Sequence, residues 1–281
     1  MGKKLGIFRR SKPETTIDLG YEKTYQIETP EDCGLLIGKT HGIGTRSKQQ
    51  DSFGISELKP DTMKDKGVLA ILADGMGGLS DGEKASMATV ISCLNYFDTH
   101  DMGEDMSDHL ISMAQNANTE VKEVLGHSSG TSGSTLAAAL VKGRELFWLS
   151  IGDSRIFLYR DGTLEQISRD HNYAADLQEK VEAGELTPDE VQKDPQKNAL
   201  TSYIGIDLLE KIDYSINPLA LQEEDRILLV SDGVYNSLTL EEIMDSMQLP
   251  IGRSMMHLGM QIEGKRKKNQ DNYTAIVLEV R

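Results

Sequence analysis

The chain has 281 residues, of which 38% are hydrophobic, so it can bury a sizeable core as one large domain or two small ones. Its formal net charge of −15 argues against a nucleic-acid partner, which would require a basic face. No apolar stretch approaches the roughly 20 residues that span a bilayer, and the two distant cysteines, Cys33 and Cys93, imply a reducing cytoplasm rather than a disulfide framework.

The chain begins with a basic segment, MGKKLGIFRRSK, which lacks the apolar region of a signal peptide. We expect residues 1–30 to form a flexible, solvated tail. Residues 31–281 are expected to form a single domain.

The first half of that domain alternates between strands and helices. Apolar runs that end in glycine-rich turns predict strands at 33–44, 48–58 and 67–78, the last with the fully apolar pattern of a sheet centre. Apolar residues at three- and four-residue spacing then predict helices at 81–97 and 106–125.

The second half follows the same alternation. Residues 132–168 predict three or four strands, with a hairpin turn at Asp161-Gly162. Further strands are expected at 211–221, 225–233 and 272–280, and helices at 239–248 and 251–264. This order predicts an α+β fold in which two sheets pack together and helices lie outside them.

Five aspartates lie in short turns next to these strands, and they are the most informative feature of the sequence. They are Asp51 in QQDS, Asp74 in ADGMGG, Asp153 in IGDSR, Asp232 in VSDG and Asp271 in NQDN. Buried carboxylates that face one another repel and lose solvation, so a fold retains them where cations neutralise them. Several hard oxygen ligands favour Mg²⁺ or Mn²⁺ over zinc, and no Cys or His pair lies near them. The pattern predicts a metal cluster at the ends of strands.

Seven short motifs occur in the order typical of one known family. They are GTRSKQQDS, ADGMGG, SGST, IGDSR, NALTSYIG, VSDG and NQDNYT. Any one of them is weak, because Asp-Gly and Gly-Asp-Ser occur in ordinary turns. Together, over residues 35–281, they resemble the protein phosphatase 2C-like, metal-dependent serine/threonine phosphatases of the bacterial type. The resemblance implies a four-layer α-β-β-α fold, in which two antiparallel sheets are flanked by helix pairs.

The resemblance also implies a ligand set for two Mn²⁺ or Mg²⁺ ions. Asp74 would bridge both ions, the Gly75 carbonyl would ligate one, and Asp232 and Asp271 would complete the shell of the other. The glycines after Asp74 would let the backbone approach a ligand closely.

The resemblance also implies roles for two further aspartates, which would not ligate the first two ions. Asp51 matches a residue that holds metal-bound water. Asp153 matches one that contacts a third ion in bacterial members, although an ordinary acidic β-turn is an alternative.

Arg46 lies five residues before Asp51 in the same motif. A lone arginine is usually a solvated surface residue, but a phosphate dianion near so many carboxylates needs a cationic group to dock against. By resemblance, Arg46 binds the substrate phosphate.

The sequence departs from common family patterns at two positions. Gln50 replaces a frequent glutamate, which removes one negative charge and predicts weaker binding of the second ion. Met76 stands where some members have histidine as a general acid; methionine transfers no proton, and it is common in bacterial members. His41 and His171 lie near motifs, and a structural or surface role is expected for each.

The resemblance implies a reaction without a side-chain nucleophile. A hydroxide that bridges the metal ions would attack phosphorus in line, with Arg46 and the ions stabilising the phosphoryl oxygens. Substrates would be phosphoserine and phosphothreonine on proteins, in opposition to a cytosolic kinase, and a monomer is expected. Residues 170–198, polar and helical with a start signal at Thr187, resemble the family's mobile flap beside the active site, or else form a solvated connector.

Two other functions are compatible with parts of the sequence. A non-catalytic regulator of the same fold could bind phosphoproteins or nucleotides, but it would be expected to lack some of Asp74, Asp232 and Asp271. A calcium-binding module would need D-x-D-x-D-G spacing in one loop, which the sequence does not contain.

Overall fold

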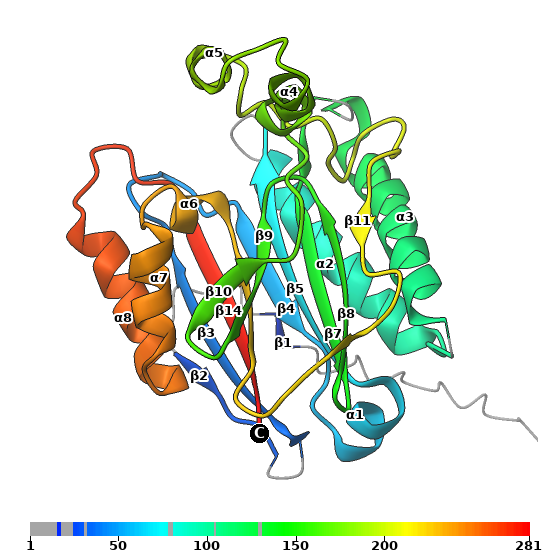
Figure 1. Ribbon diagram of the computed structural model, residues 1–281. Helices are drawn as coiled ribbons and strands as arrows, with labels where there is room; N and C mark the ends of the chain where they lie inside the picture. The colour runs from blue at the N-terminus through cyan, green and yellow to red at the C-terminus, as the bar shows by residue number, and fades with distance from the viewer. Residues whose placement is uncertain (1–15, 18–24, 31–32, 78–80, 104, 129–130) are drawn as a thin grey trace, which may run out of the picture.

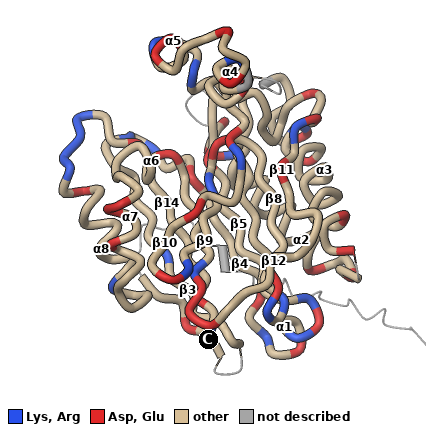
Figure 2. Tube along the Cα trace, in the orientation of Figure 1, with Lys and Arg blue, Asp and Glu red and all other residues tan. Residues whose placement is uncertain are grey.

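The structure is a computed structural model, and it describes residues 16–17, 25–30, 33–77, 81–103, 105–128 and 131–281. Two antiparallel sheets pack face to face, and helices cover the outer face of each sheet (Figure 1). This confirms the predicted α-β-β-α sandwich. Charged residues are concentrated on helices and loops, whereas most of the strand interior is uncharged (Figure 2).

Sheet A has eight strands in the order β1-β4-β5-β7-β8-β11, with β6 paired to β5 and β12 paired to β8. The central strand β5 lies between β4 and β7, as its apolar sequence predicted. The bounds are β1 (Thr16–Ile17), β4 (Asp51–Ile55), β5 (Val68–Met76), β6 (Gly133–Ser134), β7 (Leu136–Lys142), β8 (Glu145–Ile151), β11 (Asp213–Tyr214) and β12 (Leu219–Ala220).

Sheet B has six strands in the order β10-β9-β13-β14-β3-β2. The Asp161-Gly162 hairpin joins β9 to β10, and both turn residues have positive φ (51° and 78°), as a type I′ turn requires. The bounds are β2 (Gln26–Ile27), β3 (Leu35–Gly42), β9 (Arg155–Arg160), β10 (Thr163–Gln166), β13 (Arg226–Val230) and β14 (Tyr273–Val280).

The long helices fall where the 3.6-residue pattern predicted them. Helices α2 and α3 cover sheet A, and α7 and α8 cover sheet B (Figure 1). Capping boxes at Thr187 and Thr239 start α5 and α7. The bounds are α1 (Pro60–Lys66), α2 (Asp81–Thr99), α3 (Met106–Leu125), α4 (Tyr173–Glu182), α5 (Pro188–Lys193), α6 (Asp232–Tyr235), α7 (Leu240–Met247) and α8 (Ile251–Gly264).

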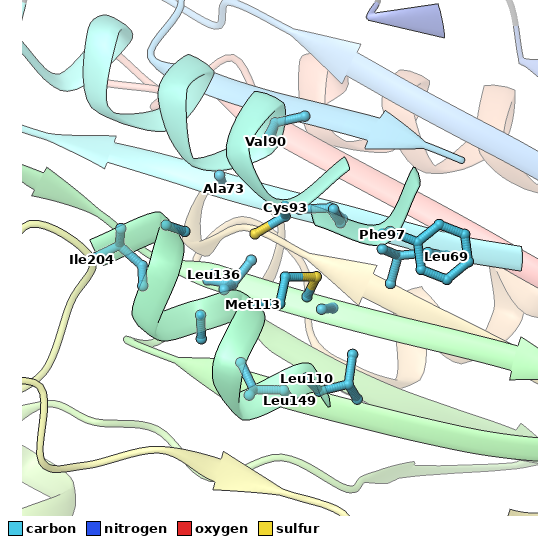
Figure 3. Close-up of a cluster of buried hydrophobic side chains, with 14 of the residues drawn as sticks. Leu69, Ala73, Val90, Cys93, Phe97, Leu110, Met113, Leu136, Leu149 and Ile204 are labelled. Carbon is cyan, nitrogen blue, oxygen red and sulfur yellow. The ribbon is translucent and has the colours of Figure 1, made fainter. Parts of the chain in front are cut away.

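The alternation of side chains along β5 divides the core between two layers. Leu69 and Ile71 point to α2 and α3, whereas Ala70 and Leu72 point to sheet B. Cys93 is buried in the first of these layers (Figure 3), where burial raises the pKa of its thiol. A buried thiol with a raised pKa forms little of the reactive thiolate at neutral pH.

The predicted flexible tail is wrong for part of its length. Strand β1 pairs with β4, and β2 pairs with β3 at the edge of sheet B. Tyr25 and Ile27 pack against buried clusters, so this segment contributes apolar contacts that a solvated tail would not make. Residues 1–15 and 18–24 lie outside the described residues.

Two local predictions also differ from the structure. The single strand expected at 211–221 is two short edge strands, β11 and β12, both paired to β8. Pro218 lies between them and has no backbone N–H to offer a continuous ladder. Helix α1, with Pro60 in its first turn, was not predicted, because its seven residues are too few for a clear apolar period.

Candidate active site

The five aspartates come from both sheets and lie at one end of the sandwich. Asp51 starts β4 and is the direct cross-strand partner of Asp74 in β5. Asp232 follows β13 and Asp271 precedes β14, and because these strands are antiparallel neighbours, the two turns meet. Asp153 lies in the turn between β8 and β9, where the chain passes from sheet A to sheet B.

A pocket of about 400 Å³ opens at this end, and four of the five aspartates line it. Arg46 and the glycines after Asp74 also face it, whereas Asp51 lies beneath it. The lining residues are Arg46, Gln50, Asp74, Gly75, Met76, Gly77, Thr135, Asp153, Asn198, Ala199, Leu200, Asp232, Asp271 and Asn272.

Asp51 is only 4% exposed, and hydroxyl groups hold its carboxylate from sheet B. Its Oδ2 accepts hydrogen bonds from Ser231 Oγ at 2.8 Å and Thr274 Oγ1 at 2.6 Å. Its Oδ1 is buried and has no hydrogen-bond partner among the described residues. A buried carboxylate oxygen left without a donor is costly, so this atom is available to a cation or a water molecule.

The SGST motif holds the backbone of Asp74 in place. The Asp74 N–H donates to Thr135 Oγ1 at 2.8 Å, and the Asp74 carbonyl accepts from Thr135 N at 2.8 Å and from Ser134 Oγ at 3.0 Å. The motif belongs to the family pattern in the sequence, but the pattern alone indicates no role for it. Its function in the fold is to fix the main chain on both sides of one carboxylate.

Burial and mutual repulsion govern the electrostatics of the pocket. The pKa of Asp74 is raised well above its usual value by burial first, and then by the negative charges of Asp51 and Asp232. Burial also raises the pKa of Asp232 to about 7, with further repulsion from Asp153 and Asp271. Ionisation of any one of these carboxylates therefore opposes ionisation of its neighbours, as expected of a cluster that binds cations.

Two other aspartates of the cluster show the same trend. Burial raises the pKa of Asp51 to about 6 against the opposing hydrogen bonds from Thr274 and Ser231. Burial and the charge of Asp170 raise the pKa of Asp153 to about 6.

Arg46 is paired with Asp271, at 2.5 Å between Nη2 and Oδ2. This hydrogen bond is the main reason that the pKa of the guanidinium is raised. The side chain of Asn272 clamps the same loop by donating to the carbonyls of Ile43 (2.9 Å) and Lys48 (3.0 Å). Arg46 thus lies at the pocket on a loop fixed from β14, and is not an isolated surface cation.

Asp153 is supported by Tyr235 and Arg155. The hydroxyl of Tyr235 donates to the Asp153 carbonyl at 3.1 Å, and the guanidinium of Arg155 lies 3.7 Å from the centre of the Tyr235 ring. Arg155 also holds Asp170 through both of its carboxylate oxygens, at 2.7 to 3.2 Å. No local pattern in the sequence indicates a role for Tyr235, because its partner is 82 residues away.

Gly75 is required for a reason that differs from the one expected. A Cβ at this position would lie 2.1 Å from the carbonyl oxygen of Gly82 in the first turn of α2. The close approach of a helix, in addition to any ligand, therefore excludes a side chain here. At Gly77, φ is +131° and a Cβ would meet Ser132, so both conformation and space demand glycine.

The two histidines near the motifs have structural partners. His41 Nδ1 lies 2.9 Å from Thr274 Oγ1, and burial lowers its pKa to about 4, with a smaller contribution from Lys39. His171 Nδ1 accepts from the Gly152 N–H at 3.2 Å and so supports the turn that carries Asp153. Neither is among the residues that line the pocket.

The end of the predicted flap reaches the pocket. Helices α4 and α5 lie beyond the ends of the strands (Figure 1), and the residues that follow, Asn198 to Leu200, form part of the pocket wall. The segment is anchored where Asn172 bridges to Leu200.

The pocket offers the types of donor atom that a hard divalent cation prefers, although the described side chains do not converge on one point as ligands. Carboxylate and carbonyl oxygens are the donors that Mg²⁺ and Mn²⁺ prefer, and the unpartnered Asp51 Oδ1 lies under them. Among the described residues, no three His, Cys, Asp or Glu side chains form a ready ligand group.

Comparisons with known proteins agree with this fold and pocket. The family model of protein phosphatase 2C matches residues 37–263. The serine/threonine protein phosphatase PstP of Mycobacterium tuberculosis is 32% identical over 218 residues, which cover 75% of this chain and 40% of PstP. The chain therefore spans less than half the length of that relative.

Solved structures extend the similarity to nearly the whole domain. The serine/threonine phosphatase of S. agalactiae superposes with a TM-score of 0.77 at 28% identity, covering 88% of this chain and 100% of the other. The catalytic domain of PstP, solved in complex with two manganese ions, gives 0.70 at 27% identity, covering 88% and 98%. The chain belongs to the protein phosphatase 2C family.

Proposed function

We propose that this protein hydrolyses phosphoserine and phosphothreonine on other proteins in a metal-dependent reaction. The observation that carries the proposal is the pocket in which Asp74, Asp153, Asp232 and Asp271 meet beside Arg46. Family membership and similarity to relatives named serine/threonine phosphatases support it. The raised pKa values of the carboxylates also support it. Carboxylates that are gathered to bind cations repel one another when the cations are absent, and this repulsion raises their pKa values.

The residues of the pocket would hold two Mn²⁺ or Mg²⁺ ions. Asp74, the Gly75 carbonyl, Asp232 and Asp271 are the proposed ligands, and Asp153 is the proposed ligand of a third ion. Such ions, when bound, supply Lewis acidity, which lowers the pKa of water and offsets charge on phosphoryl oxygens. The manganese-bound catalytic domain of PstP supports the choice of ion.

The other residues of the pocket would bind and orient the substrate. Arg46 would exchange the carboxylate of Asp271 for a phosphate oxygen, a change between two anionic partners of the same guanidinium. Asp51 would orient water through Oδ1 while Ser231 and Thr274 hold its other oxygen. Met76 has no titratable proton, so the proton for the leaving group would come from solvent.

The decisive test is hydrolysis of p-nitrophenyl phosphate and of a phosphothreonine peptide with Mn²⁺, Mg²⁺ or EDTA. We expect turnover with either ion and none after chelation. Full activity after exhaustive chelation, or a requirement for zinc alone, would contradict the proposal. Binding of phosphopeptide without any turnover would indicate instead a non-catalytic regulator of the same fold.

The role of Arg46 has a separate test. Arg46→Ala should raise the KM for a phosphopeptide by about tenfold and weaken inhibition by inorganic phosphate, because one charge-assisted contact is lost. Arg253→Ala, an exposed arginine on α8, is the matched control. Unaltered kinetics in Arg46→Ala would return Arg46 to the role of a surface cation.

We also propose a cytoplasmic monomer that opposes a serine/threonine kinase. Cys33 and Cys93 form no disulfide with each other, which supports a reducing compartment. Within the described residues, no helix is both long and apolar enough to cross a bilayer. Light scattering after size exclusion tests the monomer, and loss of phosphorylation on a kinase's targets when this protein is added tests the partnership.

A further inference from the structure

An exposed run of four cations lies between α8 and β14, in a chain whose net charge is −15. It is formed by residues 265–268 (Lys-Arg-Lys-Lys), here called the basic loop. Figure 2 shows it as a continuous blue segment beyond the end of α8. Four adjacent like charges repel one another, so the loop is a strong local source of positive potential.

The basic loop is fastened to the loop that carries Arg46. The N–H of Thr45 donates to the Gln270 carbonyl at 2.9 Å, and Thr45 Oγ1 donates to the Lys268 carbonyl at 3.3 Å. Lys268 precedes Asp271 by three residues, so their Cα atoms are at most about 11 Å apart. The backbone of the basic loop therefore lies next to the loop that carries Arg46 into the candidate active site.

Two of the four cations are available to an external ligand. Lys265 pairs with Glu242, and Lys267 donates to the carbonyl of Asn236. The side chains of Arg266 and Lys268 are exposed and have no ion-pair partner among the described residues. At Arg266, φ is 47°, and this left-handed turn leads the chain out of the helix.

A second pocket, of about 240 Å³, lies beside the basic loop. Ile43, Ile262 and Tyr273 give it apolar walls, and Arg266 lies at its edge. Glu263, which also lines it, accepts a hydrogen bond from the Tyr273 hydroxyl at 2.9 Å. The pocket gives an extended peptide an apolar surface next to free positive charge.

We propose that the basic loop binds acidic side chains of the substrate polypeptide and so directs the enzyme to phosphorylated residues with acidic neighbours. This inference rests on the proposed phosphatase function and names the substrate class of the same site. A peptide matches the feature better than a nucleic acid or an anionic membrane does. The positive patch is small, and an extended polyanion would also meet the surrounding acidic surface.

The position of the loop sets the spacing of the acidic residues. An extended peptide advances by about 3.3 Å per residue, so the distance limit of about 11 Å corresponds to at most about three residues. The long side chains of Arg266 and Lys268 extend this reach by about one residue more. Acidic residues about three and four positions from the phosphorylated residue should therefore give the largest effect.

The test compares two phosphothreonine peptides that differ only in two glutamates or two glutamines at those positions. The quantity measured is the ratio of their kcat/KM values, acidic over neutral. In Arg266→Gln/Lys268→Gln this ratio should fall by about threefold to tenfold, the range expected when two exposed charge pairs are lost. It should fall likewise in the wild type at about 1 M salt, where the screening length is about 3 Å.

A matched control removes two exposed cations far from the loop, by Lys64→Gln/Arg253→Gln, and should keep the wild-type ratio. An equal ratio in wild type and Arg266→Gln/Lys268→Gln would overturn the inference. So would a loss of binding to anionic vesicles or duplex DNA in that variant with the peptide ratio unchanged. Hydrolysis of p-nitrophenyl phosphate by the wild type tests the phosphatase function separately, because this substrate has no peptide to dock.

Discussion

An aspartate lies next to each end of β13, and the two carboxylates have opposite electrostatic surroundings. Asp225, at the start of the strand, has a side chain that is 1% exposed, and Arg160 holds both of its oxygens, at 2.8 and 2.5 Å. The N–H of Gln222 donates to it as well, at 2.7 Å. Asp232, just beyond the other end, instead faces the carboxylates of Asp153 and Asp271, and its pKa is raised to about 7.

This difference separates a structural carboxylate from a candidate functional one. A buried charge with a full set of partners depends on its pairing, so removing one partner is strongly destabilising. A buried carboxylate among other carboxylates weakens the metal-free fold and persists where function requires it. Sequence alone does not distinguish the two, since both lie beside the same apolar strand in DRILLVSDG.

The largest expected effect is on turnover. Asp232→Asn should lower kcat with p-nitrophenyl phosphate at saturating Mn²⁺ by about 100-fold or more, because a proposed ligand loses its charge. The variant should remain folded by circular dichroism. Turnover within twofold of the wild type would remove Asp232 from the proposed ligand set.

A substitution at Asp225, at the other end of β13, should change the stability of the fold instead of turnover. Asp225→Asn should lower the free energy of unfolding in urea by about 2–4 kcal/mol, since Arg160 and the Gln222 N–H lose a charged acceptor. Its turnover should match the wild type at temperatures where both are folded. Asp161→Asn, an exposed turn residue that tolerates asparagine at positive φ, is the control and should change stability little. A stable Asp225→Asn variant without activity would reverse the assignment.

The third prediction concerns pH in the metal-free protein. The folded-state pKa of Asp232, about 7, exceeds its unfolded value of about 4. The folded state therefore binds the proton more tightly, and the stability contributed by this group is lost as pH rises from about 4 to 7. Asp232→Asn escapes this loss, so its stability relative to the wild type should increase by about 2–3 kcal/mol between pH 5 and pH 8.

Urea unfolding in EDTA at pH 5 and pH 8 measures this difference, and Asp161→Asn again serves as the control. Added Mn²⁺ should reverse the order by stabilising the wild type more than the variant. A difference that stays constant with pH would show that Asp232 is not held in a repulsive environment.

The smallest expected effect tests the charge count of the cluster at Gln50. Its Nε2 is buried without a hydrogen-bond partner among the described residues, and its side chain lines the pocket. Gln50→Glu should lower the Mn²⁺ concentration for half-maximal activity several-fold, because one added charge is worth about 1 kcal/mol after screening. Calorimetric titration with Mn²⁺ gives a second reading. An unchanged or higher midpoint would make Gln50 a spacer only.

The sequence by itself determined the layers of the fold and most of the pocket. The apolar periods located the long helices and the central strand β5, because these depend on local alternation. The order of the motifs, through the family resemblance, predicted that Asp74, Asp232 and Asp271 lie together at one end of the sandwich with Arg46 beside them, and all four residues line one pocket. Strand order in a known family fixes which turns meet, so these placements needed no coordinates.

Only the tertiary structure decided which partner each polar group takes. Asp51 lies beneath the pocket because Ser231 and Thr274 hold it, and these residues are 180 and 223 positions away in the chain. The Arg46–Asp271 pair joins residues separated by 225 positions. Periodicity reports only on neighbours within a few residues, whereas these contacts arise when two sheets pack and bring distant turns within hydrogen-bond distance.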